Sequence, residues 1–416
     1  MRADVVVIGG GAVGIGVAHA LGARGARVTV LERGDRPGQA CSLGNAGIVG
    51  AGHVEPLATL DALREGIGAL PNRAGPLAIG VRPSTLTWVM RFAGAALRNR
   101  DGRAAAALRR LAEESAAMHA ELGARLDTGW TRRGFLSVYR DAAAFAAIPA
   151  PSESAQVLDA PGVRAILPGI ADPVAGGVLE PREAHCDPER FVAALAAEAV
   201  AEHGVTIETG VEVLAIRAVS RRVHGLLTSH GDVRAGTVVL AAGAWSADLL
   251  RGLPASLPLQ GGKGYHVELP AQDGDPALPV YLPEERVVVT PLDGRLRVAG
   301  TLEIAGTDER VSLRRLDGVL RAATEALPSL AGRPALRVWR GLRPCTPDGL
   351  PAVGPAPGVD GLLLATGHGM WGLQLAPVTG RIVADLLDGG AGEPALDPAR
   401  FAFQAARGTM RITRRT

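Results

Sequence analysis

The chain has 416 residues, of which 47% are hydrophobic and 3% aromatic, and 44 basic against 42 acidic side chains give a net charge of +2. This length predicts two interleaved domains with cores of alanine, valine and leucine. The balanced charge gives no electrostatic reason to expect a nucleic acid partner.

No apolar run in the sequence reaches the roughly 18 residues that would span a bilayer. Because the first expected strand begins at residue 4, we expect no signal peptide. The three cysteines, Cys41, Cys186 and Cys345, are far apart and lack the spacing of metal ligands. We therefore expect no metal and a reducing compartment, the cytoplasm.

The most informative segment lies at the start of the chain. Val5–Ile8 is an apolar run without alternation, typical of a parallel strand covered on both faces. The pattern G-x-G-x-x-G follows, formed by Gly9, Gly11 and Gly14. A helix that starts near Gly11 would direct free N–H groups at a pyrophosphate. After a second strand, Val28–Leu31, Glu32 stands where a carboxylate binds the hydroxyls of an adenosine ribose. This order predicts a dinucleotide-binding unit.

The next segments are a loop and helices. Gln39–Gly52 is rich in glycine and other small residues, which predicts a loop that lies close to a ligand. Residues 84–124 are predicted to be helical. Within them, Ala104–Leu126 carries leucine and methionine at helical spacing, and we expect it to belong to a covering domain.

The nucleotide-binding pattern returns in the middle of the chain. Asp187 is predicted to cap a helix that has Pro188 in its first turn and runs to Gly204. Residues 205–216 predict a strand, a turn at Gly210 and a second strand. Thr237–Ala242 is predicted to be a buried strand that ends in a turn of small residues.

Three further elements complete the prediction. The residues between Val287 and Val298, with Asp293-Gly294 among them, predict a β-hairpin. Arg314–Leu327 predicts an amphipathic helix, and Leu362–Ala365 begins a final strand, turn and helix that ends near Leu387.

Several sequence blocks together resemble one family. The blocks are GGGAVG, GNAGIVGAG, TVVLAAGAWS, KGYHVELP, GRLRVAGTLEIAG, GLRPCTPDGLPAVG and LLATGHGMWGLQLAPVTGRIVADLL. In this order they resemble the FAD-dependent D-amino-acid oxidase and glycine oxidase superfamily, and bacterial D-amino-acid dehydrogenases in particular. The resemblance extends from residue 5 to about residue 387, and GLRP-x-TPDG is its most specific block.

The resemblance implies an α/β fold in which a Rossmann-like FAD-binding domain is interleaved with an α+β substrate domain that carries an antiparallel sheet. The FAD-binding domain is expected to comprise residues 1–80, 182–252 and 335–416. The substrate or cap domain is expected to comprise residues 81–181 and 253–334. The glycine motif alone is equally compatible with NAD, so FAD as the cofactor rests on the resemblance.

The resemblance also implies which residues bind FAD. The pyrophosphate and ribose contacts are Gly9, Gly11, Ala12, Val13, Gly14, Glu32, Arg33, Ala242, Gly243 and Trp245, with Val213 at the adenine. The contacts expected around the isoalloxazine are Ser42, Asn45, Ala46, Gly47, Arg343, Gly367, His368, Gly369, Met370, Trp371, Gly372 and Leu373. Because Cys345 is not where relatives with covalent flavin carry their cysteine, FAD is expected to be non-covalent.

Arg343, the arginine of GLRP, is the main catalytic candidate. A planar guanidinium can grip a substrate carboxylate with two parallel hydrogen bonds and so direct the Cα hydrogen at flavin N5. The alternative is an arginine in an ordinary ion pair. Tyr265 of KGY is the second candidate, although a tyrosine that packs within a strand is equally compatible with the pattern. Lys263 and His266 are weaker candidates.

Three residues are candidates for the substrate pocket. His53 follows the NAG loop, and Met370 and Trp371 interrupt the late glycine turn. Each could instead be a packing or solvated loop residue. His368 could contact the flavin or hold its own loop.

The implied reaction is oxidative deamination of a D-amino acid. Hydride would leave Cα for flavin N5, and the imino acid would hydrolyse to a 2-oxo acid and ammonia. A quinone or a similar acceptor would reoxidise the flavin. The resemblance is also compatible with contact to the inner face of the cell membrane or to a partner subunit. The alternatives are an oxidase or dehydrogenase for glycine, sarcosine or D-hydroxyproline, and a non-catalytic FAD-binding subunit.

Overall fold

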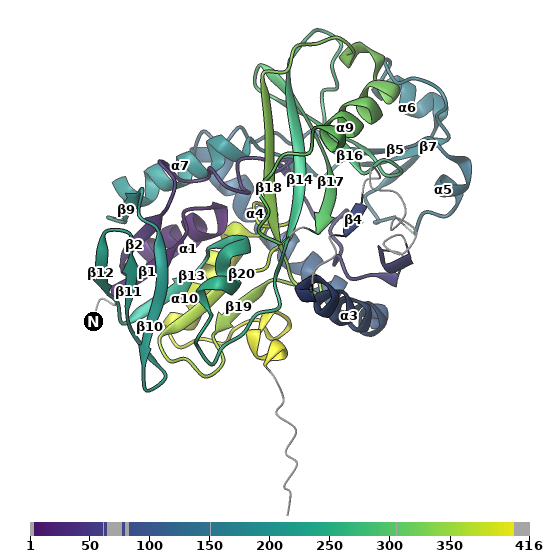
Figure 1. Cartoon of the computed structure of the whole chain (residues 1–416). Helices are drawn as coiled ribbons and strands as arrows, with labels where there is room; N and C mark the ends of the chain where they lie inside the picture. Colours follow the sequence, from purple (N-terminus) through teal and green to yellow (C-terminus); the bar gives the residue numbers. More distant parts are fainter. Residues whose placement is uncertain are drawn as a thin grey trace, which may run out of the picture.

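The structure is a computed structural model that describes residues 4–60, 62–64, 77–79, 83–149, 151–304 and 306–402. Two large sheets lie side by side, each with its own helices (Figure 1). In the described part of the chain, no helix combines the length and the apolar character needed to cross a membrane.

The first sheet has six strands in the order β19-β20-β13-β1-β2-β9. These strands are β1 (Asp4–Ile8), β2 (Arg27–Glu32), β9 (Thr206–Thr209), β13 (Thr237–Leu240), β19 (Ala352–Pro355) and β20 (Leu362–Thr366). All neighbours are parallel except β19 and β20. Both faces are covered, because Val5 and Val7 of β1 pack into one apolar cluster and Val6 and Ile8 into another. The predicted Rossmann-like sheet is therefore confirmed.

Helices cover one face of this sheet, and a small sheet covers the other. The helices are α1 (Ala12–Ala23), α4 (Arg103–Arg125), α7 (Pro188–Ala201) and α10 (Ala376–Leu387). Helix α1 crosses α10 so closely that a Cβ at Gly380 would lie 2.3 Å from the carbonyl oxygen of Gly16. The small antiparallel sheet consists of β10 (Val213–Val219), β11 (Arg222–Thr228) and β12 (Gly231–Arg234). Two short helical turns, η2 (Gly243–Trp245) and α8 (Ser246–Leu249), follow β13.

The second sheet has nine strands, most of them antiparallel. Eight follow the order β18-β14-β17-β16-β15-β5-β7-β6, and β4 pairs with β17. Their bounds are β4 (Leu77–Ile79), β5 (Phe135–Tyr139), β6 (Gln156–Asp159), β7 (Gly176–Glu180), β14 (Gln260–Pro270), β15 (Val280–Leu282), β16 (Val287–Leu292), β17 (Arg295–Ile304) and β18 (Arg337–Cys345). Among the strands that the structure describes in this sheet, only β15 with β5 and β17 with β4 pair in parallel.

Helices close the two faces of the second sheet. Helix α9 (Leu313–Ala326) packs Val319 and Ala323 on one face, together with α6 (Ala160–Ile166). Helix α3 (Pro83–Arg98) packs on Leu302, Ile304 and Cys345, which belong to β17 and β18. The remaining elements are β3 (Ile48–Val49), α5 (Ala142–Ala146), β8 (Ala184–His185), η1 (Asn99–Asp101), η3 (Pro328–Leu330), η4 (Pro394–Leu396) and η5 (Pro398–Phe401).

The predicted elements are found within a few residues of their expected bounds. The hairpin forms between β16 and β17 with Leu292 opposite Arg295. Asp187 caps α7, because its carboxylate accepts hydrogen bonds from the N–H groups of Glu189 and Arg190. Helix α7 ends at Ala201, three residues before the predicted Gly204.

Three elements lie with the other sheet than the expected domain limits give them, and one of these is β4 (Leu77–Ile79), which pairs with β17 of the second sheet. Helix α4, expected in the covering domain, packs on α10 and contributes Leu108 and Leu111 to the core of the first sheet. Strand β18, expected with the FAD-binding domain from residue 335, pairs with β14 from Arg337 to Cys345 and thus belongs to the second sheet. The predicted boundary between residues 80 and 81 and the segment 403–416 lie outside the described residues.

Candidate active site

The turn between β1 and α1 has the shape that an anion-binding site requires. Gly9 has φ +101°, and its N–H donates to the carbonyl of Leu31 over 2.9 Å. A Cβ at Gly14 would lie 1.9 Å from the carbonyl oxygen of Gly9, so only glycine fits there. Helix α1 starts at Ala12, whose N–H donates to the hydroxyl of Ser42 over 2.9 Å. The helix N-terminus and the Gln39–Gly52 loop therefore meet at one place.

Glu32 ends β2 and bends back over this turn. One carboxylate oxygen accepts the N–H of Gly10 over 2.6 Å, and the other accepts that of Gly34 over 2.8 Å. Each oxygen retains a lone pair for a further donor, such as a ribose hydroxyl. The guanidinium of Arg33 lies 3.7 Å from the ring centre of Trp245.

The remaining residues predicted at the nucleotide lie around the same turn. A Cβ at Gly9 would lie 2.7 Å from the carbonyl oxygen of Ala241, so Ala242 and Gly243 follow directly beside the glycine turn. Val213, the first residue of β10, is 8% exposed and packs in the same apolar cluster as Ile8 and Leu31. These residues thus come together although β1 and β13 are far apart in the sequence.

The NAG loop is fixed from two sides. The side-chain amide of Asn45 donates to the carbonyl of Met370 over 3.0 Å, and its oxygen accepts the N–H of Gly47 over 2.9 Å. The backbone carbonyl of Asn45 accepts from Arg297 over 2.5 Å. Ala46, between Asn45 and Gly47, is half-buried. The loop therefore joins the late glycine turn to the second sheet.

The turn from Gly367 to Leu373 lies between β20 and α10. The N–H groups of Gly372 and Leu373 donate no hydrogen bond within the described ranges, and they precede the N-terminus of α10. A Cβ at Gly372 would contact Val13 of α1 at 3.8 Å, so the first turns of two helices adjoin here. Both helix dipoles favour negative charge at this place.

His368 points away from this surface. Its Nε2 lies 3.0 Å from the hydroxyl of Thr379 in α10, and the side chain is 2% exposed. Burial lowers the pKa of His368 to about 3, so the ring is neutral at physiological pH. Its side chain holds the turn against α10, and we no longer expect it to contact the flavin.

Arg343 lies in β18 with an unusual set of neighbours. Its Nη1 donates to the backbone carbonyl of Thr301 over 2.7 Å, and this is its one hydrogen bond within the described residues. Its guanidinium covers Gly264, where a Cβ would lie 2.4 Å from Nη1. Burial lowers the pKa of Arg343, yet a guanidinium stays protonated in proteins. In the described part of the chain, this cation therefore has no carboxylate partner.

Tyr265 lies on the opposite face of the sheet from Arg343. Gly262 pairs with Arg343 and His266 with Trp339, whereas Tyr265 pairs with Arg340. Because side chains alternate between faces along a strand, Tyr265 cannot share the Arg343 face. Its hydroxyl lies 3.3 Å from Glu303 Oε2 and 3.3 Å from the backbone nitrogen of Ser312, which caps α9.

The catalytic role predicted for Tyr265 is therefore corrected. Burial raises the pKa of the Tyr265 hydroxyl to about 12, and the Glu303 carboxylate adds to this rise. The hydroxyl therefore stays protonated in its contact near the start of α9. Lys263 lies on the same face as Tyr265 and pairs with Asp308 over 3.2 Å. The tyrosine and the lysine therefore both make their polar contacts on the face of the second sheet that is turned away from Arg343.

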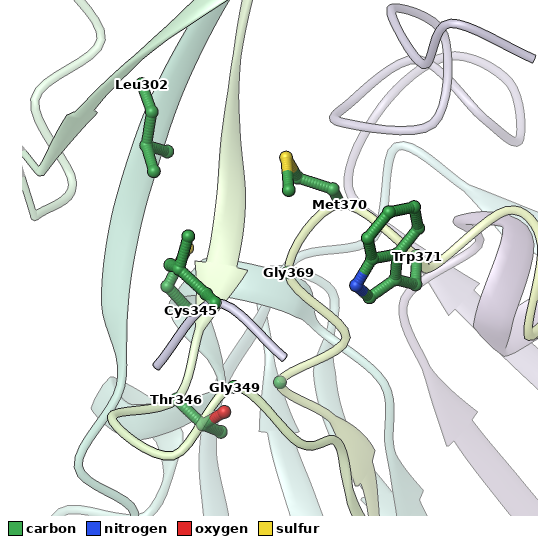
Figure 2. A pocket seen from close by; sticks show the side chains of 9 residues that line it. Leu302, Cys345, Thr346, Gly349, Gly369, Met370 and Trp371 are labelled. Carbon is green, nitrogen blue, oxygen red and sulfur yellow. The ribbon is translucent and has the colours of Figure 1, made fainter. Parts of the chain in front are cut away.

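A pocket adjoins Arg343 on its own face of the sheet (Figure 2). Leu302 and Cys345 line one side, and Met370 and Trp371 of the late turn line the other. Thr346 and Gly349 close its base. Because Cys345 is two residues from Arg343 on one strand, their side chains share a face. Two of the predicted pocket residues, Met370 and Trp371, are therefore brought to the arginine.

His53, the third predicted pocket residue, stands behind Trp371. Its ring centre lies 5.5 Å from that of Trp371 and 4.9 Å from that of Phe135. Nδ1 of His53 lies 2.5 Å from Glu183, a carboxylate that is 3% exposed. The histidine is thus fixed by an acid and lies beside the pocket wall.

A family comparison accounts for this arrangement. A match to the family described as FAD dependent oxidoreductase (DAO) spans residues 4–386. The chain belongs to the DAO family. The residues that the structure brings together fit FAD, because Glu32, the Gly9–Gly14 turn and the unpaired N–H groups before α10 provide partners for its ribose, its pyrophosphate and a charged ring edge.

This DAO-family chain is similar to proteins named D-amino acid dehydrogenase and to a solved glycine oxidase. It is 34% identical to D-amino acid dehydrogenase 2 of Ralstonia nicotianae over 96% of this chain and 99% of that one. It is also 34% identical to D-amino acid dehydrogenase of Paramagnetospirillum magneticum over 92% of this chain and 95% of that one. The glycine oxidase structure from Geobacillus kaustophilus aligns over 98% of this chain and 100% of that one, with TM-score 0.71 and 27% identity.

Sequence reasoning missed two groups of this DAO-family site. Trp339 stacks on His266 with 5.0 Å between ring centres, and a Cβ at Gly44 of the NAG loop would lie 2.0 Å from its ring. Arg297 is fully buried and pairs with Glu268 over 2.6 Å while it holds Asn45. Trp339 lies four residues before Arg343 on one strand, and this even spacing, which places both side chains on one face, could have revealed Trp339. No sequence pattern in its hairpin set Arg297 apart.

Proposed function

We propose that this protein oxidises D-amino acids, with Arg343 as the anchor of the substrate carboxylate. The observation that carries the proposal is a half-buried, desolvated guanidinium with a carbonyl as its hydrogen-bonding partner and no carboxylate within the described residues. Desolvating a cation without a partner is costly, so the fold retains it where a ligand supplies the counter-charge. The similarity to D-amino acid dehydrogenases supports an amino acid as that ligand.

The residues of the site define how the substrate is held. With one N–H of Nη1 bound to Thr301, Nη2 and Nε of Arg343 remain available for a bidentate contact with the carboxylate. Met370 and Trp371 close the opposite wall and exclude water from Cα. Bound FAD supplies the acceptor for the hydride that leaves Cα. The nitrogen lone pair forms the imine bond, and water then releases a 2-oxo acid and ammonia.

Oxidation of glycine, sarcosine or D-hydroxyproline is the second candidate. The 27% identity to glycine oxidase over nearly the full length supports it. A non-catalytic FAD-binding subunit is disfavoured, because it would have no use for a desolvated arginine without a carboxylate partner beside a pocket. The discriminating experiment is a screen of D- and L-amino acids, glycine and sarcosine with an artificial electron-accepting dye. Absence of turnover with every amino acid would contradict both enzymatic proposals.

We expect the purified protein to be yellow and to release its flavin on acid precipitation. Burial raises the pKa of Cys345 to about 12 and that of Cys41 to about 11, so both thiols are neutral and poor nucleophiles toward a flavin ring. The absorbance of the supernatant and of the redissolved pellet measures the result. Colour that stays in the pellet would show a covalent bond, and a colourless protein that does not take up FAD would contradict the cofactor assignment.

We expect a quinone or dye to reoxidise the reduced flavin much faster than oxygen does. The dehydrogenase relatives support this expectation, and a quinone acceptor would bring a cytoplasmic protein to the inner face of the membrane. Stopped-flow measurement of flavin reoxidation with each acceptor tests it. Rapid formation of hydrogen peroxide would instead favour the oxidase alternative.

A further inference from the structure

Thr301 has a backbone conformation that is unfavourable for its residue type. It lies inside β17 with φ +64°, in the left-handed region. Among the described residues, the other non-glycine residues with positive φ are Ser220, Arg221 and Arg286, which lie between strands. A β-branched residue in this region costs about 1–3 kcal/mol. Such strain persists where the surrounding structure imposes it, and it is concentrated at functional sites.

The strain arises from a bulge that faces Arg343. Lys263 pairs with Glu303 and Tyr265 with Gly300, so two residues of β17, Thr301 and Leu302, oppose the single residue Gly264 of β14. The bulge turns the carbonyl of Thr301 out of the ladder, where it accepts from Nη1 of Arg343 over 2.7 Å. The side chain of Arg343 crosses β14 over Gly264 to reach it.

The hydroxyl of Thr301 adds a second cost at the same residue. The side chain is 9% exposed, and Oγ1 is buried without a hydrogen-bond partner among the described residues. A buried hydroxyl without a partner costs about 1–3 kcal/mol. A strained backbone and an unsatisfied hydroxyl thus coincide at the residue that touches the unpaired guanidinium. The hydroxyl of Thr301 and the remaining N–H groups of Arg343 lack hydrogen-bond acceptors in the described structure, which the oxygens of a bound ligand would supply.

We infer that Thr301 is a second binding residue for the substrate carboxylate. Its carbonyl fixes the guanidinium of Arg343, and its hydroxyl donates a hydrogen bond to the carboxylate that Arg343 grips. A carboxylate only accepts hydrogen bonds, so the hydroxyl of Thr301 must act as the donor. This inference rests on the proposed function and adds to it a second residue that binds the substrate carboxylate.

The test compares Thr301→Val, which keeps the shape and the strain and removes the hydroxyl, with Thr301→Ser, which keeps the hydroxyl. The matched control is Thr290→Val in β16, because Thr290 is also a buried threonine with an unpartnered hydroxyl. Each holoenzyme is titrated with the 2-oxo acid product, followed by flavin absorbance, and KM and kcat are measured with the best amino acid. We expect Thr301→Val to raise Kd and KM about ten-fold, with kcat within about three-fold. Thr301→Ser is expected to raise Kd and KM less than Thr301→Val does, and Thr290→Val is expected to match the wild type.

A further variant separates binding from folding. Thr301→Gly removes the hydroxyl and relieves the strain, so we expect a higher Tm together with the same rise in Kd and KM. Unchanged Kd and KM in Thr301→Val, or in Thr301→Gly if the valine variant loses FAD, would overturn the inference. Failure of the proposed function has a different signature, because the wild type would then turn over no amino acid at all.

Discussion

Arg343→Lys is expected to reduce kcat/KM for the best amino acid by a factor equivalent to about 2–4 kcal/mol. An ammonium cannot supply a bidentate contact to a carboxylate while it also donates to the carbonyl of Thr301. The substrate would lose both its counter-charge and its orientation. FAD content and Tm should stay close to those of the wild type, because Arg343 is proposed to contact substrate and has no ion pair in the described structure to lose.

The matched control is Arg340→Lys on the same strand. Arg340 lies on the opposite face of β18 and bonds to the backbone carbonyl of Glu309. We expect its kcat/KM to remain within about two-fold of the wild type, as for a surface substitution. If Arg343→Lys keeps normal kcat/KM, or loses activity only because it loses FAD, the anchor role is wrong. The next candidates would then be His53 and Trp339.

Gly264→Ala is expected to reduce kcat/KM about 100-fold while the fold survives. The new methyl group would lie 2.4 Å from Nη1 and 2.5 Å from Cζ of Arg343, well inside contact distance. The guanidinium ends a flexible side chain, so it would swing aside at little cost in stability and leave the position that aims the substrate. Kinetics, FAD content and Tm measured together separate this displacement from unfolding.

A control for this substitution is Gly169→Ala, whose methyl group would meet no atom within 4 Å. We expect this variant to behave as the wild type in all three measurements. A Gly264→Ala enzyme with wild-type kcat/KM would show that the guanidinium need not lie over β14. A large fall in Tm would show instead that Gly264 serves packing.

The geometry of the glycine turn and of Glu32 was predictable from the sequence, because local physics determines it. A glycine turn, a helix N-terminus and an acid at a strand end are held at fixed spacing, so the pattern alone assigns Gly9, Gly14 and Glu32. The substrate half depends on which strand lies beside which. Arg343 was recognised by resemblance, but nothing in the sequence reveals that it crosses β14 to the bulge at Thr301.

Tyr265 shows why the substrate half of the site could not be predicted from the sequence. A one-residue difference in strand position decides which face a side chain occupies. Tyr265 of KGY was predicted to be catalytic, yet its neighbour Gly264 faces Arg343 and Tyr265 faces α9. The contact between Glu183 and His53 could not be predicted either, because it joins residues that are 130 positions apart in the sequence.

The end of β18 is attached to the turn that precedes α10. The N–H of Gly369 donates to the carbonyl of Pro344 over 2.8 Å, and Cys345 forms a bridge with His368. The strand that carries the arginine and the glycine turn that follows β20 of the first sheet are thus joined by backbone hydrogen bonds. A hinge motion that opened the two halves at this point would have to break these bonds and expose their backbone groups to water. We therefore expect substrate to enter through movement on the opposite rim, where Trp371 and His53 are held by side-chain contacts.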